Sequence, residues 1–151
     1  MDAAETPEAA AAAGDGTGPR ILVIDDDPEM RLLLEVALSA FGTVETAEDG
    51  LVGLELYRNA LRGSRPYALV CCDVQMPGMD GHQTVLALRR AESHVSANQP
   101  SRILMLTALS DRSHVQRAIA VGCDSYLVKP FGPDQLAERV RALGMVEQQA
   151  A

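Results

Sequence analysis

Strand-like apolar runs alternate with longer segments of helical spacing along this chain. Four of the runs are continuous and have the length of a strand: ILVI at 21–24, ALVCC at 68–72, ILML at 103–106 and SYLV at 125–128. A fifth, TVETA at 43–47, is less apolar and predicts a strand nearer the edge of a sheet. Continuous rather than alternating apolarity is typical of strands that are covered on both faces. The pattern therefore predicts a sheet that lies between two layers of helices.

The segments between these runs place their apolar residues on one helical stripe. The first such segment begins at Pro28 and ends near Gly42, and Pro in the first turn with Gly just past the end is the usual punctuation of a helix. Four further helices are predicted over residues 50–61, 81–91, 111–121 and 133–146. Strand and helix alternate five times, which predicts a doubly wound α/β domain, with a parallel sheet and helices on both faces.

The two ends of the chain do not share this pattern. Residues 1–19 are mostly Ala, Gly, Glu, Asp, Thr and Pro, and they cannot bury enough apolar surface to offset the entropy lost on ordering. We expect a disordered Ala-rich tail over 1–19, one folded domain over 20–147 and a disordered end over 148–151.

Composition and charge exclude several classes of function. At 151 residues the chain has the length of one domain, and its formal net charge of -8 argues against a surface that binds nucleic acid through phosphate groups. The chain has no cluster of Lys and Arg, no apolar run of membrane-spanning length and no secretory signal at its start. We expect a cytoplasmic protein that binds neither nucleic acid nor a membrane.

The cysteines and histidines do not form a recognisable ligand pattern. The chain has three cysteines, Cys71, Cys72 and Cys123. Because their number is odd and their spacing is not that of metal ligands, we expect buried small hydrophobic residues rather than a disulfide framework or a zinc site. The three histidines fall on predicted helices or a polar loop, and we expect them to be solvated surface residues: His82, His94 and His114.

Polar residues follow each of the four strong strands, at the point where the strand ends. Asp25 and Asp26 follow the first, and the others are followed by Asp73, Thr107 and Lys129. The carboxyl ends of parallel strands meet at one edge of the sheet, where open α/β sheets bind their ligands. Any one of these residues at a strand end could simply meet solvent, but five at matching ends favour a common site.

This combination of side chains indicates a particular chemistry. Crowded carboxylates repel one another, and a hard divalent cation with oxygen ligands relieves that repulsion. A carboxylate beside Mg²⁺, with an ammonium and a hydroxyl near the transferred oxygens, is the donor set of a phosphoryl-transfer site.

Four motifs together resemble the receiver domain of two-component response regulators: ILVIDDDPEMR, DVQMPGMDG, ILMLTA and YLVKPF. The resemblance covers about residues 20–146, with the motifs in the family's order. It implies a flavodoxin-like fold with five parallel strands in the order 2-1-3-4-5. It also implies a regulatory domain rather than an enzyme, one that catalyses only its own phosphorylation and dephosphorylation.

The resemblance assigns roles to the acidic residues. Asp73 corresponds to the phosphoacceptor and Asp26 to the residue that ligates Mg²⁺ directly. Asp25 corresponds to the acid that acts mostly through metal-bound water, and the backbone carbonyl of Gln75 completes the protein ligands. Asp27 carries no transferred role and, before Pro28, is expected to form a turn or cap the helix.

The resemblance also assigns a phosphate partner and a switch. Lys129 corresponds to the lysine that neutralises phosphoryl charge, and Pro130 follows it, in the family often through a cis bond. Thr107 corresponds to the switch hydroxyl that moves to the phosphoryl group, and Tyr126 to the aromatic residue that moves with it.

Three further positions are expected to control access to the phosphoryl group and its lifetime. Ala108 is small enough to leave access, while Gln75 and Leu109 lie where the family adjusts dephosphorylation. An apolar Leu109 cannot orient an attacking water, which predicts a moderately long-lived phosphoryl group.

The implied partners are proteins. A histidine kinase or a histidine phosphotransfer protein would supply the phosphoryl group, and a downstream protein would bind the face formed by residues 111–121, 125–128 and 133–146. We expect a monomer or weak dimer. An alternative is a phosphoryl relay or sink domain of a hybrid kinase.

A more distant alternative is a phosphatase of the haloacid-dehalogenase type. Its Asp-x-Asp motif is matched by Asp25 and Asp27, with Asp25 as the nucleophile. The sequence lacks that family's later pair of acids, and this hypothesis leaves Asp73 without a role.

Overall fold

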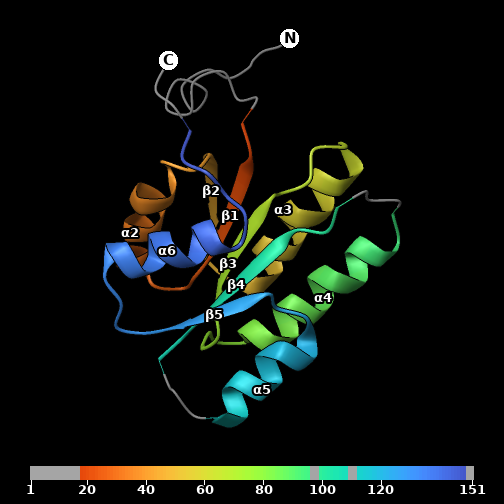
Figure 1. Ribbon diagram of the computed structural model, residues 1–151. Helices are drawn as coiled ribbons and strands as arrows, with labels where there is room; N and C mark the ends of the chain where they lie inside the picture. The colour runs from red at the N-terminus through yellow and green to blue at the C-terminus, as the bar shows by residue number, and fades with distance from the viewer. Residues whose placement is uncertain (1–17, 96–98, 109–111, 149–151) are drawn as a thin grey trace.

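The computed structural model describes residues 18–95, 99–108 and 112–148, without the side chains of 112–115. Strands and helices alternate in the order β1 (Arg20–Ile24), α2 (Pro28–Leu38), β2 (Thr43–Ala47), α3 (Gly50–Arg62), β3 (Leu69–Asp73), α4 (Gly81–Ser93), β4 (Arg102–Thr107), α5 (Arg112–Val121), β5 (Ser125–Val128) and α6 (Pro133–Ala142). All neighbouring strands are parallel and follow the order β2-β1-β3-β4-β5 (Figure 1). The predicted fold class is confirmed, with the weakest strand, β2, at an edge.

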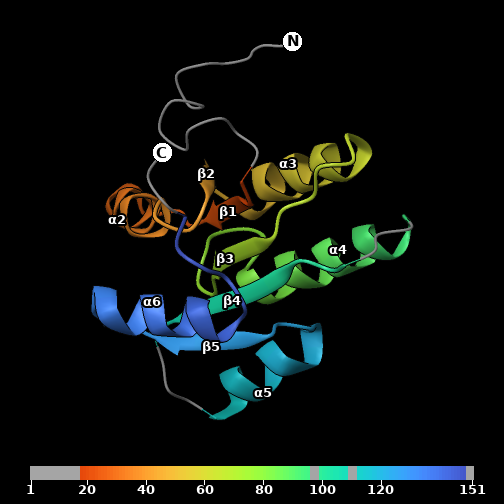
Figure 2. The same ribbon diagram turned by 45° about the horizontal axis from the view of Figure 1, so that its top comes forward.

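Helices cover both faces of the sheet. Helices α2 and α6 lie on one face, and α3, α4 and α5 lie on the other (Figure 2). In β1 the side chains of Ile21 and Val23 face α2 and α6, whereas Leu22 and Ile24 face the other layer. This alternation explains why β1 is apolar at every position from Ile21 to Ile24, because each face of the strand has its own core to fill.

Most element boundaries agree with the sequence pattern, and the differences have local causes. Asp27 is the N-cap of α2, where its side chain accepts a hydrogen bond from the Glu29 N–H. The final helix was expected to run to residue 146, but α6 ends at Ala142 because Gly144 takes a positive φ of 98°. The disorder expected over 1–19 and 148–151 falls almost entirely outside the described residues.

The strand register brings four chain segments to one edge of the sheet. Ile24 pairs with both Ala47 and Cys72, so Asp25 and Asp73 each follow a paired position at the same level. Thr107 is the last residue of β4 and pairs with Val128, which precedes Lys129. The expected convergence of strand ends therefore follows from the observed register.

Among the described residues, no helix combines the length and the apolarity needed to cross a membrane.

Candidate functional site

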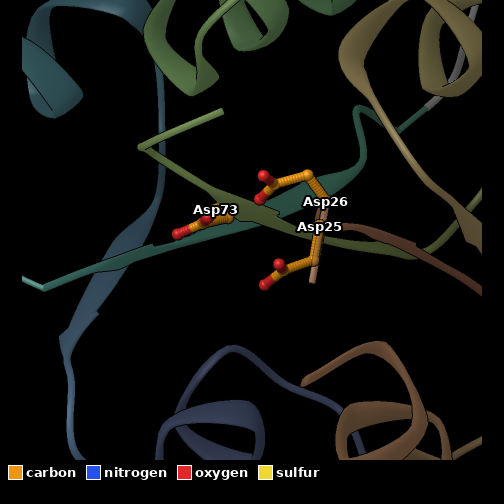
Figure 3. Close-up of side chains that lie close together, drawn as sticks. All are labelled: Asp25, Asp26 and Asp73. Atoms are coloured by element: carbon orange, nitrogen blue, oxygen red, sulfur yellow. The ribbon is translucent and has the colours of Figure 1, made fainter. Parts of the chain in front are cut away.

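Three carboxylates lie together at the carboxyl ends of β1 and β3 (Figure 3). Asp25, Asp26 and Asp73 each offer one oxygen, and these oxygens lie within 4.8 Å of one another. Their exposure differs, since Asp25 is fully buried and Asp73 is 5% exposed, while Asp26 faces solvent. The cluster is therefore reached from solvent at Asp26 and closed at Asp25.

Asp25 is held by its backbone and by one side-chain oxygen. Its N–H donates to the Ala47 carbonyl at 3.1 Å, and its Oδ1 accepts the Asp27 N–H at 2.9 Å. Burial, with the negative charge of Asp73 adding to it, raises the pKa of Asp25 to about 6, although the Asp27 N–H and Lys129 act in the opposite direction. Oδ2 accepts no hydrogen bond from the described residues, and the Lys129 ammonium lies 3.8 Å away.

Lys129 is the cation of the cluster. Its Nζ lies 3.0 Å from Asp73 Oδ1, and its backbone N–H donates to the Thr107 carbonyl at 2.7 Å. The following bond, Lys129–Pro130, is cis. Burial raises the pKa of Asp73 above its usual value even though the Lys129 ammonium favours the charged form. One ammonium therefore lies close to two of the three carboxylates, those of Asp25 and Asp73.

The donor set fits a divalent cation. The cluster supplies carboxylate oxygens only, and the buried Asp25 Oδ2 has no hydrogen-bond donor among the described residues. Lys129 is the one ion-pair partner of these carboxylates among the described residues, and a hard cation such as Mg²⁺ would neutralise the excess negative charge. Asp25, Asp26 and Asp73 could hold such an ion.

Three of the residues expected to control the switch and the access, Thr107, Gln75 and Ala108, lie at or just beyond the ends of β3 and β4. Thr107 is 4% exposed at the end of β4, next to Lys129. Gln75 and Ala108 are exposed, and the Gln75 N–H donates to the Asp73 carboxylate, which favours its charged form and a lower pKa. Leu109 lies outside the described residues.

Tyr126 lies on β5, which β4 separates from β3 and its Asp73. Its half-buried ring packs against the core shared with α3, α4 and α5. Arg139 of α6 lies over this ring, 5.8 Å from its centroid, and donates to the Tyr126 carbonyl. The structure therefore places the Tyr126 ring on the side of the sheet that α3, α4 and α5 cover. This ring does not contact the three carboxylates.

One histidine contradicts the sequence interpretation. His82 was expected on the surface but is 2% exposed. The first turn of α4 lies close to the sheet, since a Cβ on Gly81 would sit 2.2 Å from the Asp73 carbonyl oxygen, and the next residue is enclosed. His94, at the C-cap of α4, is exposed as expected.

Sequence reasoning also missed a contact at the site. Arg31 reaches back from α2 and donates to the Asp25 carbonyl at 2.8 Å. The sequence places Arg31 one turn after the N-cap of this helix. That position alone does not predict which group the long arginine side chain contacts.

Comparisons with known proteins agree with this geometry. The family model of the response regulator receiver domain matches residues 21–141. The probable transcriptional regulator ycf27 of Porphyridium aerugineum is 40% identical over 125 residues, which are 82% of this chain and 47% of that protein. The sensor histidine kinase GacS of Pseudomonas protegens is 38% identical over 123 residues, which are 81% of this chain and 13% of that kinase.

A solved structure gives the same result. The chemotaxis protein CheY4 of Vibrio cholerae superimposes with a TM-score of 0.71 at 30% identity, and the match covers 84% of this chain and 99% of that chain. In contrast, the chain spans about half the length of ycf27 and a smaller part of GacS. What the longer proteins do with their remaining parts is therefore a separate question.

Proposed function

Because this chain belongs to the response regulator receiver domain family of two-component systems, we propose that it is a phosphorylation-controlled switch with Asp73 as the phosphoacceptor. The observation that carries the proposal is the convergence of Asp25, Asp26 and Asp73, with the Lys129 ammonium 3.0 Å from Asp73. A carboxylate oxygen of Asp73 would attack the phosphorus of a phosphohistidine. The phosphorus–nitrogen bond breaks, and the imidazole leaves with the electron pair and takes up a proton.

Mg²⁺ belongs to this proposal. Asp26 and Asp73 would hold it directly, Asp25 through water, and the backbone carbonyl of Gln75 would complete the protein ligands. When bound, the ion neutralises phosphoryl charge and helps to orient the group. The buried, unbonded Oδ2 of Asp25 and the excess of carboxylates support this assignment.

The remaining side chains handle charge and conformation. Lys129 would neutralise the negative charge that the phosphoryl group brings next to Asp73. Thr107, buried at the end of β4, would turn its hydroxyl towards the phosphoryl oxygens, and Tyr126 would move inward with it. Ala108 would leave access to the site, while Gln75 and Leu109 would set the lifetime of the phosphoryl group.

The proposal includes protein partners on both sides of the switch. A histidine kinase or phosphotransfer protein supplies the phosphoryl group in the cytoplasm, and a downstream protein binds the face of α5, β5 and α6. The chain itself acts as a regulatory domain, as a monomer or weak dimer, and without nucleic acid or membrane contact.

A second candidate is a phosphoryl relay domain of a hybrid kinase, which the similarity to part of the sensor histidine kinase GacS favours. The phosphatase alternative is not favoured. Its nucleophile would be Asp25, which is fully buried, whereas the ammonium lies closest to Asp73.

The test is intact-mass measurement after incubation with acetyl phosphate and Mg²⁺. We expect a single phosphoryl adduct in the wild type, which is absent with EDTA and absent in Asp73→Asn. Asp25→Asn serves as the matched carboxylate-to-amide control, because it should slow the formation of the adduct without removing the acceptor. An adduct that persists in Asp73→Asn and disappears in Asp25→Asn would overturn the assignment of the acceptor.

A further inference from the structure

Arg31 connects the helix after the acidic cluster back to the cluster itself. It lies in the first turns of α2, half-buried, and its Nη1 donates to the Asp25 carbonyl oxygen at 2.8 Å. This carbonyl follows the last paired residue of β1, Ile24. The Arg31 side chain therefore donates a hydrogen bond to the first backbone carbonyl beyond the paired residues of β1.

The bond acts on the peptide group between two of the acids. The Asp25 carbonyl belongs to the planar unit that joins Asp25 to Asp26, so fixing this oxygen fixes the plane from which Asp26 departs. The rest of Asp25 is already held, its N–H by Ala47 and its Oδ1 by the Asp27 N–H. Asp26, by contrast, is exposed, and its direction depends on this peptide.

We propose that Arg31 is a positioning residue for the cation site, because it holds the Asp25–Asp26 peptide so that both carboxylates converge with Asp73. The inference rests on the proposed function, in which this cluster takes Mg²⁺. Residues that hydrogen-bond to metal ligands without binding the metal themselves typically lower metal affinity strongly when they are replaced.

The charge of Arg31 and its hydrogen bond act on a cation in opposite directions. A guanidinium near the cluster repels a divalent ion through space, so loss of the charge alone would tighten Mg²⁺ binding. Loss of the hydrogen bond would release the Asp25–Asp26 peptide and weaken binding. The sign of the change in affinity therefore distinguishes the two roles.

The experiment is calorimetric titration of the full chain with Mg²⁺ at fixed pH and ionic strength. The variants are Arg31→Gln, Arg31→Lys, which keeps a cationic donor, and Arg58→Gln, which removes the same charge from an exposed position two turns into α3. We expect the dissociation constant to rise about tenfold in Arg31→Gln. Arg31→Lys should recover most of this loss, and Arg58→Gln should match the wild type.

A further control separates folding from positioning. Circular dichroism gives the folded fraction of each metal-free variant, and Arg31→Met replaces Arg31→Gln if the latter is incompletely folded. Weaker binding by a fully folded variant, with recovery in Arg31→Lys, supports the inference.

Equal or tighter binding in Arg31→Gln would overturn the positioning role while leaving the cation site in place, and so would an equal loss in Arg58→Gln. No saturable binding by the wild type would instead overturn the Mg²⁺ site of the proposed function, and the inference with it.

Discussion

The ammonium of Lys129 lies 3.0 Å from the carboxylate of Asp73, across 56 positions of sequence. Asp73 is 5% exposed and is the last residue of a central strand, whereas Lys129 follows an edge strand. The same ammonium lies 3.8 Å from the fully buried Asp25. One cation therefore compensates two buried acids, and its loss would leave neither carboxylate with an ion-pair partner among the described residues.

Replacing Lys129 should destabilise the metal-free protein. We expect Lys129→Met to lower the free energy of unfolding by about 2 kcal/mol at pH 7, below the loss typical of fully buried pairs because the lysine is partly exposed. Urea unfolding in EDTA measures this change. In an Asp73→Asn background the same substitution should cost less, and an equal loss in both backgrounds would show that the pair is not coupled.

Asp25 should make the metal-free protein more stable as the pH falls. Its pKa is raised from 3.8 to about 6 in the folded chain, so between these values the folded state binds more protons than the unfolded state. The free energy of unfolding then decreases as the pH rises through this range and loses about 1 kcal/mol between pH 5 and pH 7 from this group. Urea unfolding at several pH values in EDTA measures the slope.

Asp25→Asn is the control for that measurement, since it removes the titrating group and keeps the shape. The slope between pH 5 and pH 7 should become flatter in this variant. A slope identical to that of the wild type would show that Asp25 titrates normally. Asp73, whose pKa is also raised, acts in the same direction and remains in both proteins.

Gly81 should not tolerate a methyl group. A Cβ at this position would lie 2.2 Å from the Asp73 carbonyl oxygen and 2.7 Å from Val74 Cα, which are backbone atoms of the site. We expect Gly81→Ala to lower the free energy of unfolding by about 2 kcal/mol and to slow phosphoryl acceptance. Thermal unfolding and the intact-mass assay measure these effects.

Gly132→Ala is the matched control, because a Cβ there meets no described atom within 4 Å and φ is -93°. It should change the free energy of unfolding by less than about 1 kcal/mol, the usual effect at an N-cap. If the two variants behaved alike, close packing of α4 against the Asp73 backbone would not be important.

The central cysteines should resist alkylation in the native protein. Burial raises the pKa of Cys71 to about 12 and that of Cys72 well above its usual value. At pH 8 we expect iodoacetamide to modify half-buried Cys123 slowly and the other two only after unfolding in urea. Peptide mass mapping after a timed pulse measures this order, and native Cys71 reacting as fast as Cys123 would contradict it.

The fold was predictable because each element carries its own signal. Runs such as ILVI at 21–24 are apolar on both sides, as strands between two helical layers must be, and TVETA at 43–47 has the weaker pattern of an edge strand. Asp27 before Pro28 is a local helix start, and its capping role is confirmed. Prediction was less accurate where one residue determined a helix end, as Gly144 does after α6.

The sequence by itself determined which residues gather at the edge of the sheet, because strand order and chain direction place Asp25, Asp26, Asp73 and Lys129 at matching strand ends. Tertiary packing decided how they differ. Asp25 is buried and Asp26 is exposed although they are neighbours, and Lys129 lies nearer to Asp73 than to Asp25. Such differences depend on distances between separate elements, and a residue pattern gives the direction of a side chain without its distances.

The same reason explains Arg31 and His82. The side chain of Arg31 turns back to the Asp25 carbonyl, and His82 is buried because α4 begins close against the backbone of Asp73. Both depend on how closely a helix approaches the sheet. Local sequence determines where a helix begins, and only the packed core determines how near to its neighbours it lies.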